Sequence, residues 1–254
     1  MSFRLKVASA REFKNALNAI ATLVDEGVFV IDPEGLKLRA MDPSKTAMVD
    51  FMWGRSVFDE YEAPEEGVKL CVNIDELLKL LRKAAKGESL ELGLDEATGR
   101  VKMALRGRYV KRFTIPRLET VWEEVPGELK IPFNAKIAFV SDEFKRAITD
   151  AALVADFVKF SADSEKLVLT AEGDVSSATI EFPRTCDAIV DYEVKEPSTA
   201  TFDTGMLEKM VRAGSALADV VVAEFSTDKP MKLAFRLPYE GKLIFYLAPR
   251  VEAE

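Results

Sequence analysis

The sequence contains no histidine, so catalysis by Ser-His-Asp or Cys-His groups and the usual zinc sites are excluded. No two of the thirteen glycines lie closer than six positions, which excludes the GxGxxG and P-loop phosphate cradles. There are only two cysteines, Cys71 and Cys186, both in segments that resemble strands. We expect both to be buried, reduced thiols, as in an intracellular protein.

Long apolar runs are also absent, and none approaches the roughly 18 residues that span a bilayer. Arg4, Lys6 and Arg11 interrupt the apolar core that a signal peptide would need. The 254 residues, 48% hydrophobic and 31% charged, predict a soluble globular protein with one large or two medium domains.

The strongest positive signal is a repeated pattern of one amphipathic helix followed by strands. Helices are predicted in the windows 9–22, 73–86, 141–154 and 203–216, and alternating strand patterns with polar turns follow each. The helix openers Ser9, Asn73, Ser141 and Asp203 are 64, 68 and 62 residues apart. The turn aspartates Asp32, Asp95, Asp163 and Asp228 keep similar intervals of 63, 68 and 65 residues. We interpret the chain as four copies of one unit, paired into two domains.

A proline-rich connector separates the two halves. Residues 116–134 contain Pro116, Pro126 and Pro132, which disfavour both helices and central strands. Apolar residues such as Leu129 alternate with glutamates there, so the segment either packs onto the domains or has a binding role. We predict an N-terminal domain at 1–115, a linker at 116–134 and a C-terminal domain at 135–254.

Charge is distributed unevenly on this acidic chain of net charge −8. The four helix windows together hold ten Lys and Arg against eight Asp and Glu, with the bases mostly beyond the first turn. Such placement suits the helix dipole, but its repetition also indicates a shared basic surface for contacts with a phosphate backbone. Acidic loops such as 59–62 could bind Mg²⁺ in principle, yet turn residues interrupt them, and a solvated loop is favoured.

Several motifs resemble one family over the whole chain, the archaeal and eukaryotic sliding clamp called proliferating cell nuclear antigen. The most specific are LRAMDPSK at 38–45, VNIDELLKLLRKA at 72–84, DAALVADFVKFSA at 150–162, LTAEGD at 169–174 and YLAPRVE at 246–252. The resemblance implies a non-enzymatic ring of three subunits, without cofactor or metal, around duplex DNA. Helices would line the hole and sheets would form the outside.

The resemblance also implies roles for individual residues. The DNA-facing bases would be Arg11, Lys14, Lys79, Arg82, Lys83, Arg146, Lys209 and Arg212. Some family members carry another base where this chain has Thr149, so the third helix would contact DNA more weakly. A partner-peptide groove beneath the linker would use Met41, Met48, Leu129, Pro132, Phe133, Pro230, Tyr246, Leu247, Ala248 and Pro249.

Two strand-like runs predict the contact between subunits. Residues 109–115 and 175–182 read as strands at the ends of the first and third repeat units, and both would expose unpaired backbone in a lone chain. Residues 100–112 carry six bases and no acid, whereas 172–181 carry three acids and no base. Complementary patches on one chain specify head-to-tail contacts. The predicted interface residues are Arg108, Tyr109, Lys111, Phe113, Ile115, Ser176, Ala178 and Ile180.

We therefore predict an α+β protein of two similar domains that serves as a DNA polymerase processivity factor in an archaeal cytoplasm, close to the nucleoid. Its expected partners are double-stranded DNA, two further copies of itself, and a clamp loader, polymerase, flap endonuclease and ligase that bind through short peptides, with no membrane partner. The alternatives are a carboxylate- and metal-dependent nuclease and a β-rich scaffold that forms no ring.

Overall fold

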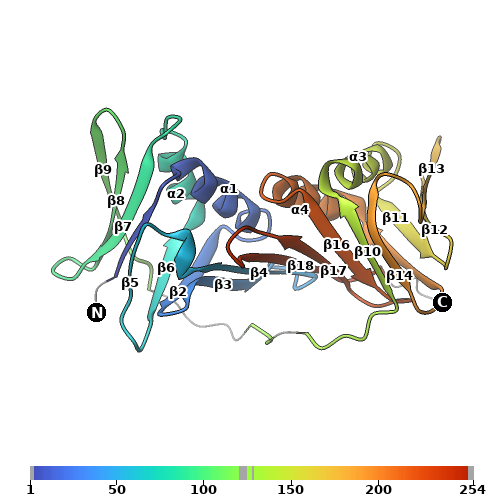
Figure 1. Ribbon diagram of the computed structural model, residues 1–254, viewed down its shortest axis with the longest axis horizontal. Coiled ribbons are helices and arrows are strands. Elements are labelled where there is room, and N and C mark those ends of the chain that lie inside the picture. Colours follow the sequence, from blue (N-terminus) through green and yellow to red (C-terminus); the bar gives the residue numbers. More distant parts are fainter. Residues whose placement is uncertain (1–2, 120–124, 128, 251–254) are drawn as a thin grey trace. The chain divides into compact units, whose positions relative to one another are not determined.

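The computed structural model describes residues 3–119, 125–127 and 129–250, and the chain forms two compact units (Figure 1). The first unit comprises Met1–Lys45, Val49–Val125 and Leu237–Lys242; the second comprises Thr46–Met48, Pro126–Arg236 and Leu243–Glu254. Among the described residues, no helix is long and apolar enough to cross a membrane.

Residues 3–115 contain two α-helices, nine strands and one short 3-10 helix. In chain order these are β1 (Arg4–Val7), α1 (Ala10–Ile20), β2 (Glu26–Asp32), β3 (Gly35–Met41), β4 (Ala47–Gly54), η1 (Arg55–Val57), β5 (Glu60–Glu62), β6 (Val68–Asn73), α2 (Ile74–Leu81), β7 (Ser89–Asp95), β8 (Arg100–Arg106) and β9 (Val110–Ile115).

The described residues from 135 onward repeat the pattern with two helices and nine strands. These are β10 (Ala135–Val140), α3 (Ser141–Ala152), β11 (Phe157–Ala162), β12 (Lys166–Glu172), β13 (Ser177–Pro183), β14 (Ile189–Val194), β15 (Ser198–Asp203), α4 (Thr204–Ser215), β16 (Val220–Phe225), β17 (Met231–Arg236) and β18 (Lys242–Leu247).

The predicted fourfold repeat is confirmed, and each copy is a strand, a helix and three antiparallel strands. The strand before each helix was not predicted, and it pairs outside its own copy. In the first unit β1 pairs with β7 and β6 pairs with β2; in the second β10 pairs with β16 and β15 pairs with β11. This exchange joins the two copies of a unit. It also places β9 at the end of the second copy, so the prediction that it ends the first was wrong.

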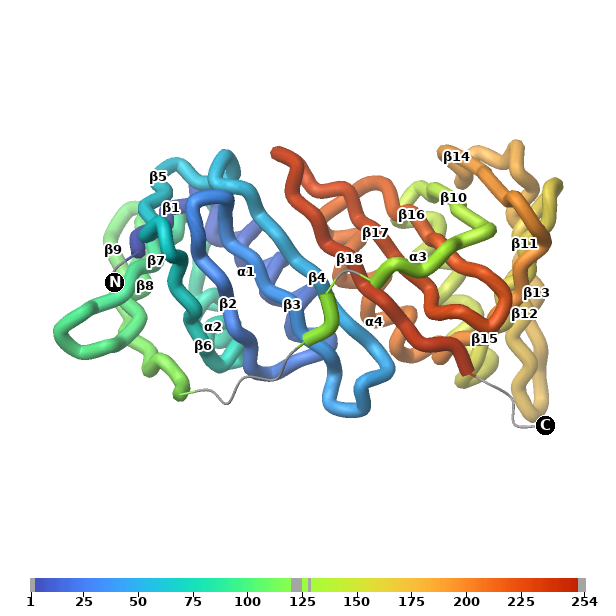
Figure 2. The backbone as a smooth tube through the Cα atoms, turned by 90° about the horizontal axis from the view of Figure 1, so that it is seen from below, coloured from blue at the N-terminus to red at the C-terminus, as the bar shows by residue number. Residues whose placement is uncertain are grey.

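Within each unit the helix pair packs against two antiparallel sheets. The first unit has the strand orders β5-β1-β7-β8-β9 and β6-β2-β3-β4, and the second has β14-β10-β16-β17-β18 and β13-β12-β11-β15. Figure 2 shows β2, β3 and β4 side by side in the first unit, and β16, β17 and β18 side by side in the second. Apolar side chains alternate inward along the strands, as a half-buried sheet requires.

Side-chain caps explain three of the four helix starts. Ser9, Asn73 and Asp203 each accept a hydrogen bond from the backbone N–H three residues later. The third helix differs, because its N-cap is Val140 and Ser141 is already helical and buried. The prediction that this helix opens at Ser141 is confirmed, but no side chain caps its start.

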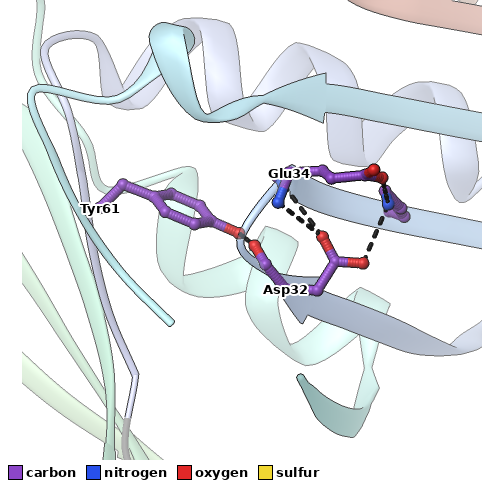
Figure 3. Close-up of polar contacts among 5 residues, drawn as sticks. Asp32, Glu34 and Tyr61 are labelled. Carbon is purple, nitrogen blue, oxygen red and sulfur yellow. Dashed lines mark hydrogen bonds and ion pairs between the residues drawn. The ribbon is translucent and has the colours of Figure 1, made fainter. Parts of the chain in front are cut away.

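The turn aspartate Asp32 is fixed by a network that closes the β2–β3 hairpin (Figure 3). Its carboxylate accepts hydrogen bonds from the backbone N–H groups of Glu34 and Gly35 and from Lys37. Burial opposes ionisation, but the bonds from Lys37 and from the backbone lower the pKa of Asp32 overall. The Tyr61 hydroxyl donates to the Asp32 carbonyl at 2.7 Å, and burial raises the pKa of this tyrosine.

The second unit repeats this network. The Asp163 carboxylate accepts from the N–H groups of Glu165 and Lys166, and the Tyr192 hydroxyl donates to the Asp163 carbonyl at 2.7 Å. Burial and the nearby Asp163 charge raise the pKa of Tyr192 to about 12. Strands β5 and β14 lie outside the four copies, one in each unit. The tyrosine on each of these strands thus holds one hairpin turn in place.

The two cysteines are free, as predicted, but only Cys71 is buried. Cys186 lies in the turn between β13 and β14 and is half-buried. The prediction of a strand position for Cys186 was wrong, because the strand ends at Pro183.

Candidate functional site

The predicted DNA-facing bases lie on the helices or just beyond them. On α1, Arg11 is exposed and Lys14 is half-buried. The second helix is shorter than its predicted window: it ends at Leu81, so Arg82 is the C-cap and Lys83 lies beyond the helix. The cause is a tightened last turn, in which the Lys83 N–H donates to the Leu80 carbonyl.

Several of these bases are paired with acids of their own helix. Lys79 pairs with Glu76, Arg146 with Glu143 and Arg212 with Glu208, at spacings of three or four residues. All three bases are well exposed, so the pairs are weak and exchange easily with solvent or ligand. The other five predicted DNA-facing bases make no ion pair within the described residues: Arg11, Lys14, Arg82, Lys83 and Lys209.

The third helix offers the least free positive charge. Lys145 pairs with Asp142, and Arg146 pairs with Glu143. Thr149 lies 3.4 Å from the Glu208 carboxylate on α4 and adds no charge. Helix α3 is therefore the most neutralised of the four.

Strands β9 and β13 are the outermost strands of their sheets. Each carries apolar side chains on its helix-facing side that no neighbouring strand covers: Phe113 on β9, and Ala178 and Ile180 on β13, are only half-buried. Tyr109, just before β9, is 67% exposed. Both edges thus present unpaired backbone together with partly exposed apolar groups.

Two further apolar residues near β13 were missed by the sequence analysis. Leu153, at the end of α3, is 81% exposed, and Val175, in the turn before β13, is 97% exposed. The close approach of Gly173 to the Val154 carbonyl brings the two turns together, because a Cβ at Gly173 would lie 2.1 Å from that oxygen. These residues extend the apolar part of the edge. A polar context hid Val175, and Leu153 resembled an ordinary helix position.

The ammonium of Lys111, a predicted interface residue, is directed toward the chain's own interior. It donates to the Glu88 carboxylate and to the Lys83 carbonyl, both at 2.7 Å. Glu88 is buried, accepts from the Ala85 N–H, and its own carbonyl accepts from the Ala10 N–H. This contact anchors β9 to the end of α2 and the start of α1.

The Glu88 contact predicts an acid-sensitive element of stability. The hydrogen bond from Lys111 and then that from the Ala85 N–H lower the pKa of Glu88 below its usual range. A lowered pKa contributes stability above the ordinary carboxyl pKa, and that stability is lost as the pH falls through the folded-state value. We expect Glu88→Gln to lower the melting temperature at pH 7, with a difference from wild type that shrinks toward pH 3. Thermal melts over this range check it, and a difference independent of pH would contradict it.

Nine of the ten predicted groove residues belong to the second unit, and Met41 belongs to the first. Met48, Tyr246 and Leu247 are buried, whereas Ala248 and Pro249 are half-buried.

Backbone contacts fix parts of this set. The Ala248 N–H donates to the Thr46 carbonyl at 2.8 Å. The buried Ser226 hydroxyl accepts from the Asn134 N–H and donates to the Pro132 carbonyl, which ties the end of the linker to the β16–β17 turn that holds Pro230. Leu129 and Phe133 are half-buried and Pro132 is exposed.

The acidic segment 59–62, considered as a metal site, is not the solvated loop that was predicted, because Glu60–Glu62 form strand β5 and Glu60 makes internal ion pairs. Glu60 accepts from Lys6 at 3.0 Å and pairs with Arg4 at 3.2 Å. Across the parts of the chain that the structure describes, no three metal-binding side chains come together.

Comparison with known proteins decides the family. The model of the proliferating cell nuclear antigen N-terminal domain matches residues 2–115, and that of the C-terminal domain matches residues 129–250. The chain belongs to the proliferating cell nuclear antigen family. This confirms the family indicated by the motifs, and the predicted α+β fold of two similar domains.

Relatives within the family align over nearly the whole chain. The DNA polymerase sliding clamp 1 of Pyrobaculum aerophilum is 36% identical over 248 residues, 98% of each chain. The DNA polymerase sliding clamp of Pyrococcus abyssi is 33% identical over 253 residues, 99% of this chain and 100% of the relative.

Solved structures from the same family agree. The proliferating cell nuclear antigen of Thermococcus kodakaraensis matches with a TM-score of 0.88 at 28% identity, over 98% of this chain and 100% of the other. A chain of the PCNA2-PCNA3 complex of Sulfolobus tokodaii matches with a TM-score of 0.89, at the same identity and coverage.

Proposed function

We propose that this protein is a sliding clamp that acts as a DNA polymerase processivity factor. The observation that carries the proposal is the match of both family domains, in order, to a chain whose relatives are named DNA polymerase sliding clamps. The clamp is not an enzyme. Its mechanism is topological, because enclosure of duplex DNA replaces tight binding.

The ring forms by head-to-tail pairing of β9 in one copy with β13 in the next. Pairing satisfies the unpaired backbone of both edges and covers Phe113, Ala178 and Ile180. Two different patches on one chain give a heterologous contact, which closes into a ring when the rotation permits. We propose closure at three copies, with helices on the inside and sheets on the outside.

Each unit presents its helix pair to DNA. The bases contact phosphates without reading sequence, and such contacts permit sliding only while they are weak. Lys79, Arg146 and Arg212 suit this requirement, because each is paired with an acid of its own helix that reduces the positive potential at the DNA. The third helix contributes least because both its bases are paired.

Partner enzymes bind by short peptides to the groove beneath the linker. Its apolar side chains and the half-buried tail at Ala248 and Pro249 would accept a helical turn with two aromatic anchors. The proposed partners are a clamp loader, DNA polymerase, flap endonuclease and DNA ligase. We place the protein in the cytoplasm at the nucleoid, with domain limits at residues 115 and 135.

The mass of the purified chain in solution tests the assembly. Light scattering at micromolar concentration will give about three times 28.2 kDa, because both sheet edges are covered only in the closed ring. A 28.2 kDa species would favour the open scaffold, unless a paralogous subunit restores the ring. Metal-dependent cleavage of DNA by the pure protein would favour the nuclease.

Removal of the bases at the end of α2 tests the DNA contact. We expect Lys79, Arg82 and Lys83 replaced together by Ala to leave the ring intact, because exposed positions cost little stability. The slope of log affinity against log salt concentration should become shallower by about two to three for each subunit that contacts DNA, as loss of up to three phosphate contacts per subunit predicts. The control replaces Lys136 and Lys159, exposed on strands of the second unit, by Ala. An equal change in salt dependence in both variants would contradict the proposal that α2 faces DNA.

A further inference from the structure

A hollow of about 430 Å³ lies on the sheet β5-β1-β7-β8-β9, on the face turned away from α1 and α2. The helices α1 and α2 cover one face of this sheet (Figure 1). Leu5, Leu92 and Met103 are buried, so the residues that alternate with them form the outer face. The hollow borders the edge strand β9 through Arg112, Phe113 and Thr114, and none of the predicted DNA-facing or groove residues lines it.

The strand register explains why the hollow exists. One row across the outer face runs Glu62, Arg4, Gly93, Lys102 and Thr114, and it has no side chain at its centre. The added Cβ at Gly93 would lie 3.2 Å from the Phe3 carbonyl, so the chain is tightly packed at this point.

The adjacent row runs Glu60, Lys6, Glu91, Ala104 and Arg112, and only a methyl group stands at its fourth position. Gly93 and Ala104 are diagonal neighbours on β7 and β8. Two adjoining gaps in the side-chain cover therefore form one notch.

The notch is ringed by more positive than negative charge. Arg4, Lys102, Arg106 and Arg112 line it, together with the acids Glu62 and Glu91. Arg106 pairs with Glu91, Arg4 with Glu60, and Lys102 with Asp95. Arg112 has no ion pair within the described residues, and it stands directly beside Ala104. A cationic notch with a free guanidinium contrasts with the acidic chain around it.

We propose that this notch binds an acidic peptide segment of a partner protein in an extended conformation. Lys102 and Arg112 are diagonal neighbours, a relation that separates residues by about 7–8 Å. Carboxylates on alternate residues of an extended peptide repeat at about 6.6–6.8 Å, so one can reach each base. Charge-assisted hydrogen bonds to Arg112 would supply geometric specificity.

A peptide fits the notch better than a nucleic acid does. Single-stranded nucleic acid needs aromatic faces for base stacking. The rings among the lining residues belong to the inner face, with Phe3 buried and Phe113 half-buried. Duplex DNA needs a long stripe of cations, whereas these bases surround one compact hollow.

The test measures binding of a fluorescein-labelled decapeptide of alternating Glu and Thr to the full chain by anisotropy at low salt. We expect binding of this peptide and none of its Gln-Thr counterpart. The double variant Arg4→Gln with Lys102→Gln should weaken binding by about ten-fold, a change of about 1.4 kcal/mol. Ala104→Leu, which fills the notch without changing charge, should weaken it similarly.

The matched control, Lys136→Gln with Lys159→Gln, removes two exposed bases from strands of the second unit and should bind within about two-fold of wild type. Failure of the Glu-Thr peptide to bind, or equal weakening by both double variants, would overturn the proposal. So would displacement of the peptide by a thymidine decamer at lower concentration than by unlabelled peptide. The chosen variants leave β9 and β13 unchanged. A failure of peptide binding is therefore distinguishable from a failure of the ring to form.

Discussion

We expect Ile180→Asp to convert the proposed trimer into folded monomers. Ile180 is half-buried on the helix-facing side of β13, an edge strand that pairs with β12 on one side only. Pairing with β9 of another copy would bury a new carboxylate without a partner, which costs several times the free energy of a typical surface change. Light scattering will report a fall from about three times 28.2 kDa to one. Circular dichroism will confirm that the monomer is folded.

A charge on the other face of the same strand provides the control. Thr179→Asp places a carboxylate one residue away, at an exposed outward position, and should leave the trimer intact. Ala178→Pro is a second disruptive variant, because proline removes a backbone donor from the edge or distorts it. A trimer that persists in both Ile180→Asp and Ala178→Pro would show that β13 is not the contact.

We expect Ala248→Asp to weaken strongly the binding of the proposed partner peptides while the proposed ring persists. Ala248 is half-buried beyond the end of β18, and its N–H is held by the Thr46 carbonyl, so the new carboxylate cannot move away easily. The bound peptide would remove water from the new carboxylate and offer it no positive partner. We expect this to weaken the affinity for the peptide by about 100-fold.

The measurement uses a peptide with Gln, an aliphatic residue three positions on, and then two aromatics, titrated by calorimetry. Ala97→Asp, in the exposed β7–β8 turn, makes the same substitution in the first unit and should bind like wild type. Unchanged affinity in a folded Ala248→Asp ring would exclude this groove. Leu247 is less useful for the test, since it is buried and a charge there would also damage the core.

The elements that sequence predicted well are those defined by local patterns. All four helices and the turns at Asp32, Asp95 and Asp163 follow from apolar periodicity and from side chains that accept nearby backbone N–H groups. The outward and inward alternation on β9 and β13 also follows from period two.

What sequence could not predict depends on pairing between distant segments. The strand before each helix pairs with a strand of the neighbouring copy, and no local pattern specifies that exchange. Lys111 illustrates the same limit, because its acceptors Glu88 and Lys83 lie 23 and 28 residues away. The notch on the outer face likewise requires the register that sets Gly93 beside Lys102.

Retention on DNA with blocked or open ends tests the central claim most directly. Linear duplex is tethered to a bead at one end, the protein is added at high concentration to thread onto the free end, and that end is then closed by a bulky bound protein. Because enclosure and not affinity retains the ring, the protein should survive a high-salt wash while the end is closed and be released within minutes once it is opened. Equal retention with the end open and closed would contradict a topological clamp.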